Sequence, residues 1–192
     1  MLFRSVEMQK LSKWNKGYKY LLMVLDLFSK YGWIVPLKTK TGLEVSKSFG
    51  TIFKKAKAKP KKLWVDKDKE YYNKNVKDLL AKNNIEIYST ENEEKSSVCE
   101  RWNRTIKEKM YKRFTMQNNT VHIDILLKIL ASYNNSKNRS IGMTPNEARK
   151  RENYGRVYWN LYGDLEKQVR YDNQGNILEI YDKPTGKTDT DR

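Results

Sequence analysis

The order of the apolar segments predicts a mixed α/β fold, in which helices pack on a β-sheet. Residues 18–27 form a nearly continuous apolar run, which is typical of a strand buried on both faces. Residues 31–37 follow as a second short apolar run, and residues 43–57 repeat apolar side chains at helical spacing. Strand-length and helix-length segments then alternate along the chain, as in layered α/β proteins.

The amino-terminal half is predicted to supply the sheet. Residues 2–9 form a first strand and the chain then turns at Asn15-Lys16-Gly17, ahead of the strands over 18–27 and 31–37. The helix over 43–57 ends before Pro60, because the residue that precedes a proline disfavours helical geometry. The rest of the expected order β-β-β-α-β-α-β is a strand over 62–65, a helix over 73–83 and a strand over 85–88.

Beyond Thr90 the sequence predicts helices. Ser96 or Ser97 is expected to cap a helix that runs to about Phe114, and residues 121–135 form a second helix. Thr144-Pro145 followed by Glu147 indicates an N-cap, a first-turn proline and a capping-box acid.

The chain is expected to divide into three parts. Residues 1–151 form the core. Residues 152–182 form a carboxyl-terminal extension with a small hairpin, whose strands cover 169–171 and 177–181. Residues 183–192 form a disordered tail.

The charge indicates a polyanionic partner. The 192 residues carry 39 Lys and Arg against 23 Asp and Glu, a formal net charge of +16. The excess is concentrated in residues 1–162, and residues 38–82 alone contain 14 lysines. Such a field favours nucleic acid, although a solvated lysine-rich face is the alternative reading. No apolar stretch approaches the ~18 residues of a membrane span, and we expect an intracellular, soluble domain.

Three carboxylates occupy positions from which backbone geometry could bring them together. Asp26 ends the long buried strand, Asp66 ends the strand over 62–65, and Glu100 lies in the first turn of the long helix. Oxygen ligands of this kind bind hard divalent cations, and two such ions can act on a phosphodiester. The alternative is that Asp26 and Asp66 are ordinary turn or cap residues.

The helix around Glu100 sharpens this prediction. Glu100, Arg104, Lys107 and Tyr111 share one face at helical spacing. That face presents a carboxylate beside two cations, as a surface that holds metal and phosphate would. The competing interpretation is a plain ion pair between Glu100 and Arg104. The opposite face is apolar and is expected to pack inward; it contains Val98, Trp102, Ile106 and Met110.

Over residues 5–163 the sequence resembles retroviral-type integrase cores. The segment 18–37 (YKYLLMVLDLFSKYGWIVPL) is similar to two strands of that family. The segment that begins LWVDKDKEYYN places Asp66 at the second catalytic acid, and ENEEKSSVCERWNRTIKEKM places Glu100 at the third. The segment 133–148 (YNNSKNRSIGMTPNEA) resembles the family's helical signature. STENEEK and VYWNLYG look closest to integrases of Maverick/Polinton-type transposons.

The resemblance implies a ribonuclease H-like fold with a mixed five-stranded sheet, and DNA integration by a polynucleotidyl transferase. In this family three carboxylates hold Mg²⁺ (or Mn²⁺) for 3′-end processing and strand transfer. The implied partners are DNA, as element ends and target, and a second copy of the chain in a homodimer. A DNA partner implies the nucleus. The resemblance also implies that Arg104, Lys107, Lys67 and Lys69 contact DNA.

The first catalytic acid of the family is missing. Aligning Val6-Glu7-Met8-Gln9 with the family's pattern puts Arg4 where this acid is expected, and a guanidinium cannot ligate a metal ion. We therefore expect a DNA-binding core with impaired catalysis. One alternative is an active integrase in which Asp26 or Glu7 completes the metal site, although Glu7 is expected on the opposite face of the strand from position 4. Another is a non-catalytic nucleic-acid-binding module.

Cysteine and histidine give little sign of chemistry. The single cysteine, Cys99, excludes an internal disulfide and a multi-cysteine zinc site. It is expected to be a small buried thiol. The single histidine, His122, is expected on a helix surface.

Overall fold

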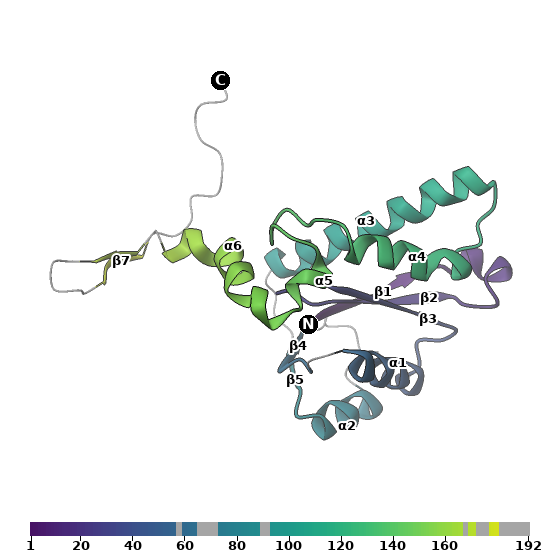
Figure 1. Cartoon of the computed structure of the whole chain (residues 1–192). Helices are drawn as coiled ribbons and strands as arrows, with labels where there is room; N and C mark the ends of the chain where they lie inside the picture. Colours follow the sequence, from purple (N-terminus) through teal and green to yellow (C-terminus); the bar gives the residue numbers. More distant parts are fainter. Residues whose placement is uncertain (57–58, 65–72, 89–92, 167–168, 172–176, 181–192) are drawn as a thin grey trace.

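The computed structural model describes residues 1–56, 59–64, 73–88, 93–166, 169–171 and 177–180. Its centre is a five-stranded sheet in the order β3-β2-β1-β4-β5 (Figure 1). The strands are β1 (Leu2–Glu7), β2 (Tyr20–Leu25), β3 (Gly32–Leu37), β4 (Lys62–Trp64) and β5 (Glu86–Tyr88). The first three strands are antiparallel, whereas β4 is parallel to β1 and β5 is parallel to β4. The mixed five-stranded sheet of the sequence prediction is confirmed.

Helices cover both faces of the sheet (Figure 1). On one side lie α1 (Gly42–Lys55) and α2 (Lys74–Lys82), and on the other lie α3 (Glu93–Gln117) and α4 (Ile123–Asn134). The short helices are η1 (Gln9–Trp14), α5 (Pro145–Ala148) and η3 (Arg151–Asn153), followed by α6 (Tyr154–Glu166). Strands β6 (Val169–Tyr171) and β7 (Ile177–Ile180) pair antiparallel in a separate two-stranded sheet.

The alternation of β2 explains the two cores. Leu22 and Val24 join the cluster under α1, whereas Leu21, Met23 and Leu25 join the cluster under α3 and α4. Every side chain of β2 after Tyr20 is buried, as expected for a central strand covered on both faces. The apolar face of α3 packs against the sheet as predicted. It joins the cluster of Leu21, Met23 and Leu25 through Val98, Trp102, Ile106 and Met110.

One helix begins earlier than predicted, and one helix was not predicted. Helix α3 begins at Glu93, so Ser96 and Ser97 lie inside its first turns and do not cap it. Acidic residues at this end favour the earlier start, because carboxylates stabilise the positive end of a helix. Helix α6 was not predicted, although Tyr154, Val157, Tyr158 and Leu161 follow helical spacing.

The capping box at α5 is formed as the sequence predicts. Thr144 accepts a hydrogen bond from the Glu147 N–H at 3.2 Å, and the Glu147 carboxylate accepts one from the Thr144 N–H at 2.8 Å. Pro145 occupies the first turn. This short helix lies against α4 and leads through η3 into α6 (Figure 1).

Candidate functional site

Strand β1 and helix α3 bring two charged side chains together on one face of the sheet. Arg4 lies in β1 opposite Met23 of β2, on the face that α3 covers. Its Nη1 donates a hydrogen bond of 2.8 Å to Oε1 of Glu100 on α3. The side chains of Arg4 and Glu100 are 41% and 53% exposed, so this is a solvated ion pair. A pair of this kind contributes about 0–1 kcal/mol to stability.

The ion pair lies in a cleft of about 560 Å³ between β1 and α3. The predicted charged face of α3 forms one wall, because Glu100, Arg104, Lys107 and Tyr111 all line the cleft. The other lining residues are Arg4, Ser5, Val6, Glu7, Asn103 and Glu108. The lining therefore combines three cations with three carboxylates, and Arg4 and Glu100 compensate each other.

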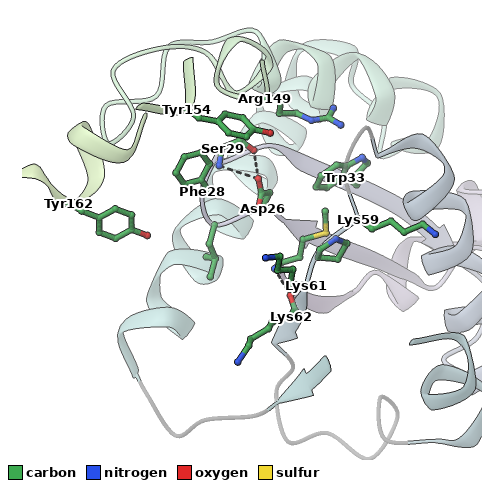
Figure 2. Close-up of a pocket in the computed structure, with 13 residues that line it drawn as sticks. Asp26, Phe28, Ser29, Trp33, Lys59, Lys61, Lys62, Arg149, Tyr154 and Tyr162 are labelled. Carbon is green, nitrogen blue, oxygen red and sulfur yellow. Dashed lines mark hydrogen bonds between the residues drawn. The ribbon is translucent and has the colours of Figure 1, made fainter. Parts of the chain in front are cut away.

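Asp26 lies elsewhere. It follows β2, where Ser29 donates hydrogen bonds to its Oδ2 from Oγ at 2.5 Å and from the backbone N–H at 3.2 Å. Figure 2 shows Asp26 in a second cavity, which Phe28, Tyr154 and Lys61 also line. Arg4 and Glu100 line the first cleft and not this one. Asp26 therefore has the turn-stabilising contacts of the alternative reading, and it does not line the cleft that contains Glu100.

Glu7 lines the edge of the cleft, but its hydrogen bond points to the other side of the sheet. Gln9 donates to the Glu7 carboxylate at 3.3 Å and to the Tyr20 hydroxyl at 3.0 Å. Tyr20 is the cross-strand neighbour of Glu7 and packs against the cluster under α1. This placement agrees with the odd spacing between Arg4 and Glu7 in an extended strand.

The remaining predicted site residues, Asp66, Lys67 and Lys69, lie outside the described residues. Among the residues that are described, no three His, Cys, Asp or Glu side chains form a group that could hold a metal ion. In the cleft, the guanidinium of Arg4 occupies Oε1 of Glu100 and adds a positive charge. This part of the site does not fit Mg²⁺, which needs oxygen ligands and is repelled by a neighbouring cation.

The two residues with little predicted chemistry have different outcomes. Cys99 is buried with Leu2 and Trp64, as expected for a structural thiol. The expectation for His122 is wrong, because its side chain is fully buried just before α4. Asn15 accepts a hydrogen bond from the His122 N–H at 2.7 Å and thereby holds this segment against the loop after η1.

The exposed tyrosines of α6 are not among the predicted site residues. Tyr154, Tyr158 and Tyr162 are spaced four residues apart and are 41%, 49% and 40% exposed. Tyr154 and Tyr162 line the second cavity (Figure 2). The signal was the periodic spacing of aromatic residues in a segment that was predicted only as an extension of the core.

Solved structures with the same fold are retroviral integrases. The HTLV-2 integrase catalytic core domain in complex with magnesium has a TM-score of 0.64 and 18% identity, over 78% of this chain and 94% of that chain. The simian T-cell lymphotropic virus intasome, in complex with PP2A regulatory subunit B56 gamma, has a TM-score of 0.67 and 16% identity, over 97% and 59%. The catalytic core of BIV integrase has a TM-score of 0.60 and 17% identity, over 76% and 90%.

One protein of similar sequence is transposon-derived. A transposon-derived protein of Caenorhabditis elegans is 37% identical over 138 residues, which are 72% of this chain and 48% of that protein. The chain thus spans about half the length of this relative. No protein-family model matches the chain. None of the described helices is long and apolar enough to cross a membrane. The chain has an integrase-like core with the ribonuclease H-like fold of retroviral integrase catalytic domains, and its sequence is similar to that of a transposon-derived protein.

Proposed function

We propose that this chain is a DNA-binding core of the transposon integrase type in which the metal-dependent chemistry is impaired. The observation that carries the proposal is the hydrogen bond between Arg4 and Glu100, the residue that the family resemblance assigns to the third catalytic acid. A cation in direct contact with this carboxylate opposes the binding of a divalent ion at the same oxygen. By the family resemblance, position 4 is the place of the first catalytic acid. The arginine at this position therefore removes another oxygen ligand.

DNA binding is supported by charge and placement. The chain carries a net charge of +16, and Arg104 and Lys107 lie beside the ion pair in the same cleft. Because the charges of Arg4 and Glu100 neutralise each other, Glu100 does not neutralise Arg104 or Lys107. The side chains of Arg104 and Lys107 therefore remain available to phosphates. Basic side chains that contact phosphates provide affinity that falls steeply with salt. The proposal includes Asp66, Lys67 and Lys69 as further residues of this site.

The family resemblance also supports proposals for the oligomeric state, the cellular location and the type of mobile element. One HTLV-2 integrase core is described in complex with magnesium in a trimeric form, and another in a dimeric form. We include homodimerisation, a nuclear location and kinship with integrases of Maverick/Polinton-type transposons in the proposal. An active enzyme completed by Asp26 is disfavoured, because Asp26 lines a different cavity.

Duplex binding tests the first part of the proposal. The affinity of the chain for a fluorescent 20-base-pair duplex is measured by anisotropy between 50 and 200 mM salt. We expect a steep linear decrease of log K with log salt, and a slope smaller by roughly one unit for Arg104→Ala or Lys107→Ala. Lys47→Ala is the matched control, because Lys47 is exposed on α1, on the other side of the sheet. A flat salt response, or an equal effect of Lys47→Ala, would contradict the assignment.

Nicking of the same DNA tests the second part. The purified chain is incubated with supercoiled plasmid and Mg²⁺ or Mn²⁺, with Glu100→Gln in parallel. We expect no nicking above the level of Glu100→Gln. Nicking by the wild-type chain that Glu100→Gln abolishes would show that the site is active and that the ion pair does not impair it.

A further inference from the structure

The second cavity has a cationic side and an aromatic side. It holds about 470 Å³ near the amino ends of β1 and β4. Figure 2 shows Lys59, Lys61 and Lys62 on one side, and Tyr154 and Tyr162 of α6 on the other. Arg149 also lines it, so the lining contains four cations and one carboxylate, Asp26. The cleft at Arg4 and Glu100, in contrast, is balanced in charge.

The cations are placed for an external anion. Lys62 is bound to Glu86 at 3.2 Å, but the ammonium groups of Lys59 and Lys61 make no ion pair within the described parts of the chain. The guanidinium of Arg149 stacks over Tyr31 at 4.1 Å from the ring centre and lies 5.3 Å from that of Trp33. Stacking fixes the orientation of an arginine while its N–H groups stay available as donors.

The aromatic side continues along α6 as a stripe. Tyr154 packs edge-on against Phe28 with ring centres 5.5 Å apart, which fixes the start of α6 at the cavity. Tyr158 and Tyr162 are in contact, with ring centres 5.1 Å apart. Three exposed rings at intervals of four residues form a row along one face of the helix. Such a row offers successive flat surfaces next to the cations.

We propose that this cavity binds a single-stranded segment of nucleic acid. Phosphates contact Lys59, Lys61 and Arg149, and unpaired bases stack on the tyrosines of α6. A positively charged groove with aromatic side chains is the arrangement by which proteins bind single strands without sequence preference. A duplex cannot use it in this way, because its bases already stack on one another. The inference extends the proposed function to a second surface and a different form of the ligand.

Asp26 adds a polar contact that suits a base rather than a phosphate. Ser29 donates both of its hydrogen bonds to Oδ2, and Oδ1 makes none within the described residues. A carboxylate oxygen accepts a hydrogen bond from the exocyclic amino group of cytosine, which adds a preference for cytosine at this one position of an otherwise sequence-independent site. We therefore place the base edge at Asp26 and the backbone at the lysines.

Affinity for matched single and double strands tests this proposal. The full chain is titrated with a fluorescent 15-nucleotide single-stranded DNA of mixed sequence, the RNA of the same sequence, and the corresponding DNA duplex. We expect Tyr162→Ala to weaken single-strand binding by roughly five- to 150-fold, the range that the loss of one stacked base produces. Tyr162→Phe should keep the wild-type affinity, because it keeps the ring. Trp14→Ala removes a comparably exposed ring far from the cavity and serves as the matched control.

The two proposals fail separately in this experiment. Tyr162→Ala should leave duplex binding unchanged, whereas Arg104→Ala and Lys107→Ala should weaken duplex binding and leave the single-strand site intact. Equal losses for Tyr162→Ala and Trp14→Ala, or no loss for Tyr162→Ala, would overturn the single-strand site alone. A loss restricted to DNA or to RNA supports the site and identifies the source of the strand. Cross-linking of iodouridine-substituted DNA to Tyr154 or Tyr162 would support the site independently, and cross-links confined to other elements would contradict it.

Discussion

Arg4 of β1 and Glu100 of α3, which lie 96 positions apart in the chain, are joined by a hydrogen bond of 2.8 Å. The contact ties the central strand of the sheet to the helix that crosses it. Both side chains are partly exposed, so the pair adds little to stability and mainly determines the charge of the cleft. Because Arg4 neutralises the Glu100 carboxylate, this cleft lacks the excess of negative charge that attracts a divalent cation.

Replacing Arg4 by aspartate should convert the cleft into one that attracts a divalent ion. In Arg4→Asp two carboxylates lie close together, and their repulsion is relieved when Mg²⁺ binds. We expect 10 mM MgCl₂ to raise the melting temperature of Arg4→Asp by several degrees more than that of the wild type, because a ligand that binds only the folded state stabilises it. Differential scanning fluorimetry measures this difference.

Two controls accompany that experiment. Arg4→Asn introduces a side chain of the same size as aspartate but without its negative charge. This variant should behave like the wild type toward Mg²⁺. Arg4→Asp combined with Glu100→Gln should lose the response. The same Mg²⁺ response in Arg4→Asn, or none in Arg4→Asp, would count against the placement of position 4 in the metal site.

Asn134 should be important for stability, because its side chain makes the backbone hydrogen bonds that a neighbouring strand would otherwise make at the start of β3. Its side chain accepts a hydrogen bond from the Gly32 N–H at 3.0 Å and donates one to the Gly32 carbonyl at 3.1 Å. Asn134→Ala leaves both buried groups without a partner, which should lower the free energy of unfolding by about 1–3 kcal/mol. Urea denaturation measures the loss. Ser132→Ala, at an exposed position of the same helix, should change it by less than about 0.5 kcal/mol. A similar value for both variants would contradict the role of Asn134.

His122 should make the stability depend on pH. Burial lowers its pKa below the ordinary value of 6.5, and neither ring nitrogen makes a hydrogen bond within the described residues. As the pH falls through 6.5, the unfolded chain binds the proton more readily than the folded one does, so the free energy of unfolding decreases. Above about pH 7.5 this contribution is constant, because both states are neutral.

The single histidine makes this dependence easy to isolate. We expect urea denaturation between pH 7.5 and 5.5 to show a progressive loss for the wild type. His122→Leu introduces an apolar side chain of similar bulk that cannot bind a proton. This variant should lose less stability over the same pH range. Parallel pH profiles for the two proteins would show that His122 is not the titrating group.

The capping box at α5 gives a smaller, local effect. Thr144→Ala removes the acceptor for the Glu147 N–H and should cost about 1 kcal/mol. Thr144→Ser keeps the hydroxyl and should stay close to the wild type in thermal denaturation. If Thr144→Ser were as destabilised as Thr144→Ala, packing of the methyl group and not the cap would explain the loss.

Much of the fold could be predicted because its signals are local. The continuous apolar run of β2, the helical spacing in α1 and the sequence Thr144-Pro145 with Glu147 are each signals that lie within a few residues of one another. Helix α6 also has a local signal, the spacing of its aromatic residues, although the sequence prediction contains no helix there, and α3 begins earlier than the prediction. The burial of His122 has no local signal, because it involves Asn15, more than 100 positions away.

The amino-acid sequence alone predicts the layered α/β class, the strongly basic character, and the face of α3 that carries Glu100, Arg104 and Lys107. These follow from composition and from periods of two and 3.6 residues, which need no knowledge of distant contacts. The packing of sheet and helices is needed to see that Arg4 binds Glu100, that Asp26 lines a different cavity, and that Tyr154 and Tyr162 line the same cavity as Lys59 and Lys61. Each of these joins residues from separate elements, and their distances depend on how sheet and helices pack.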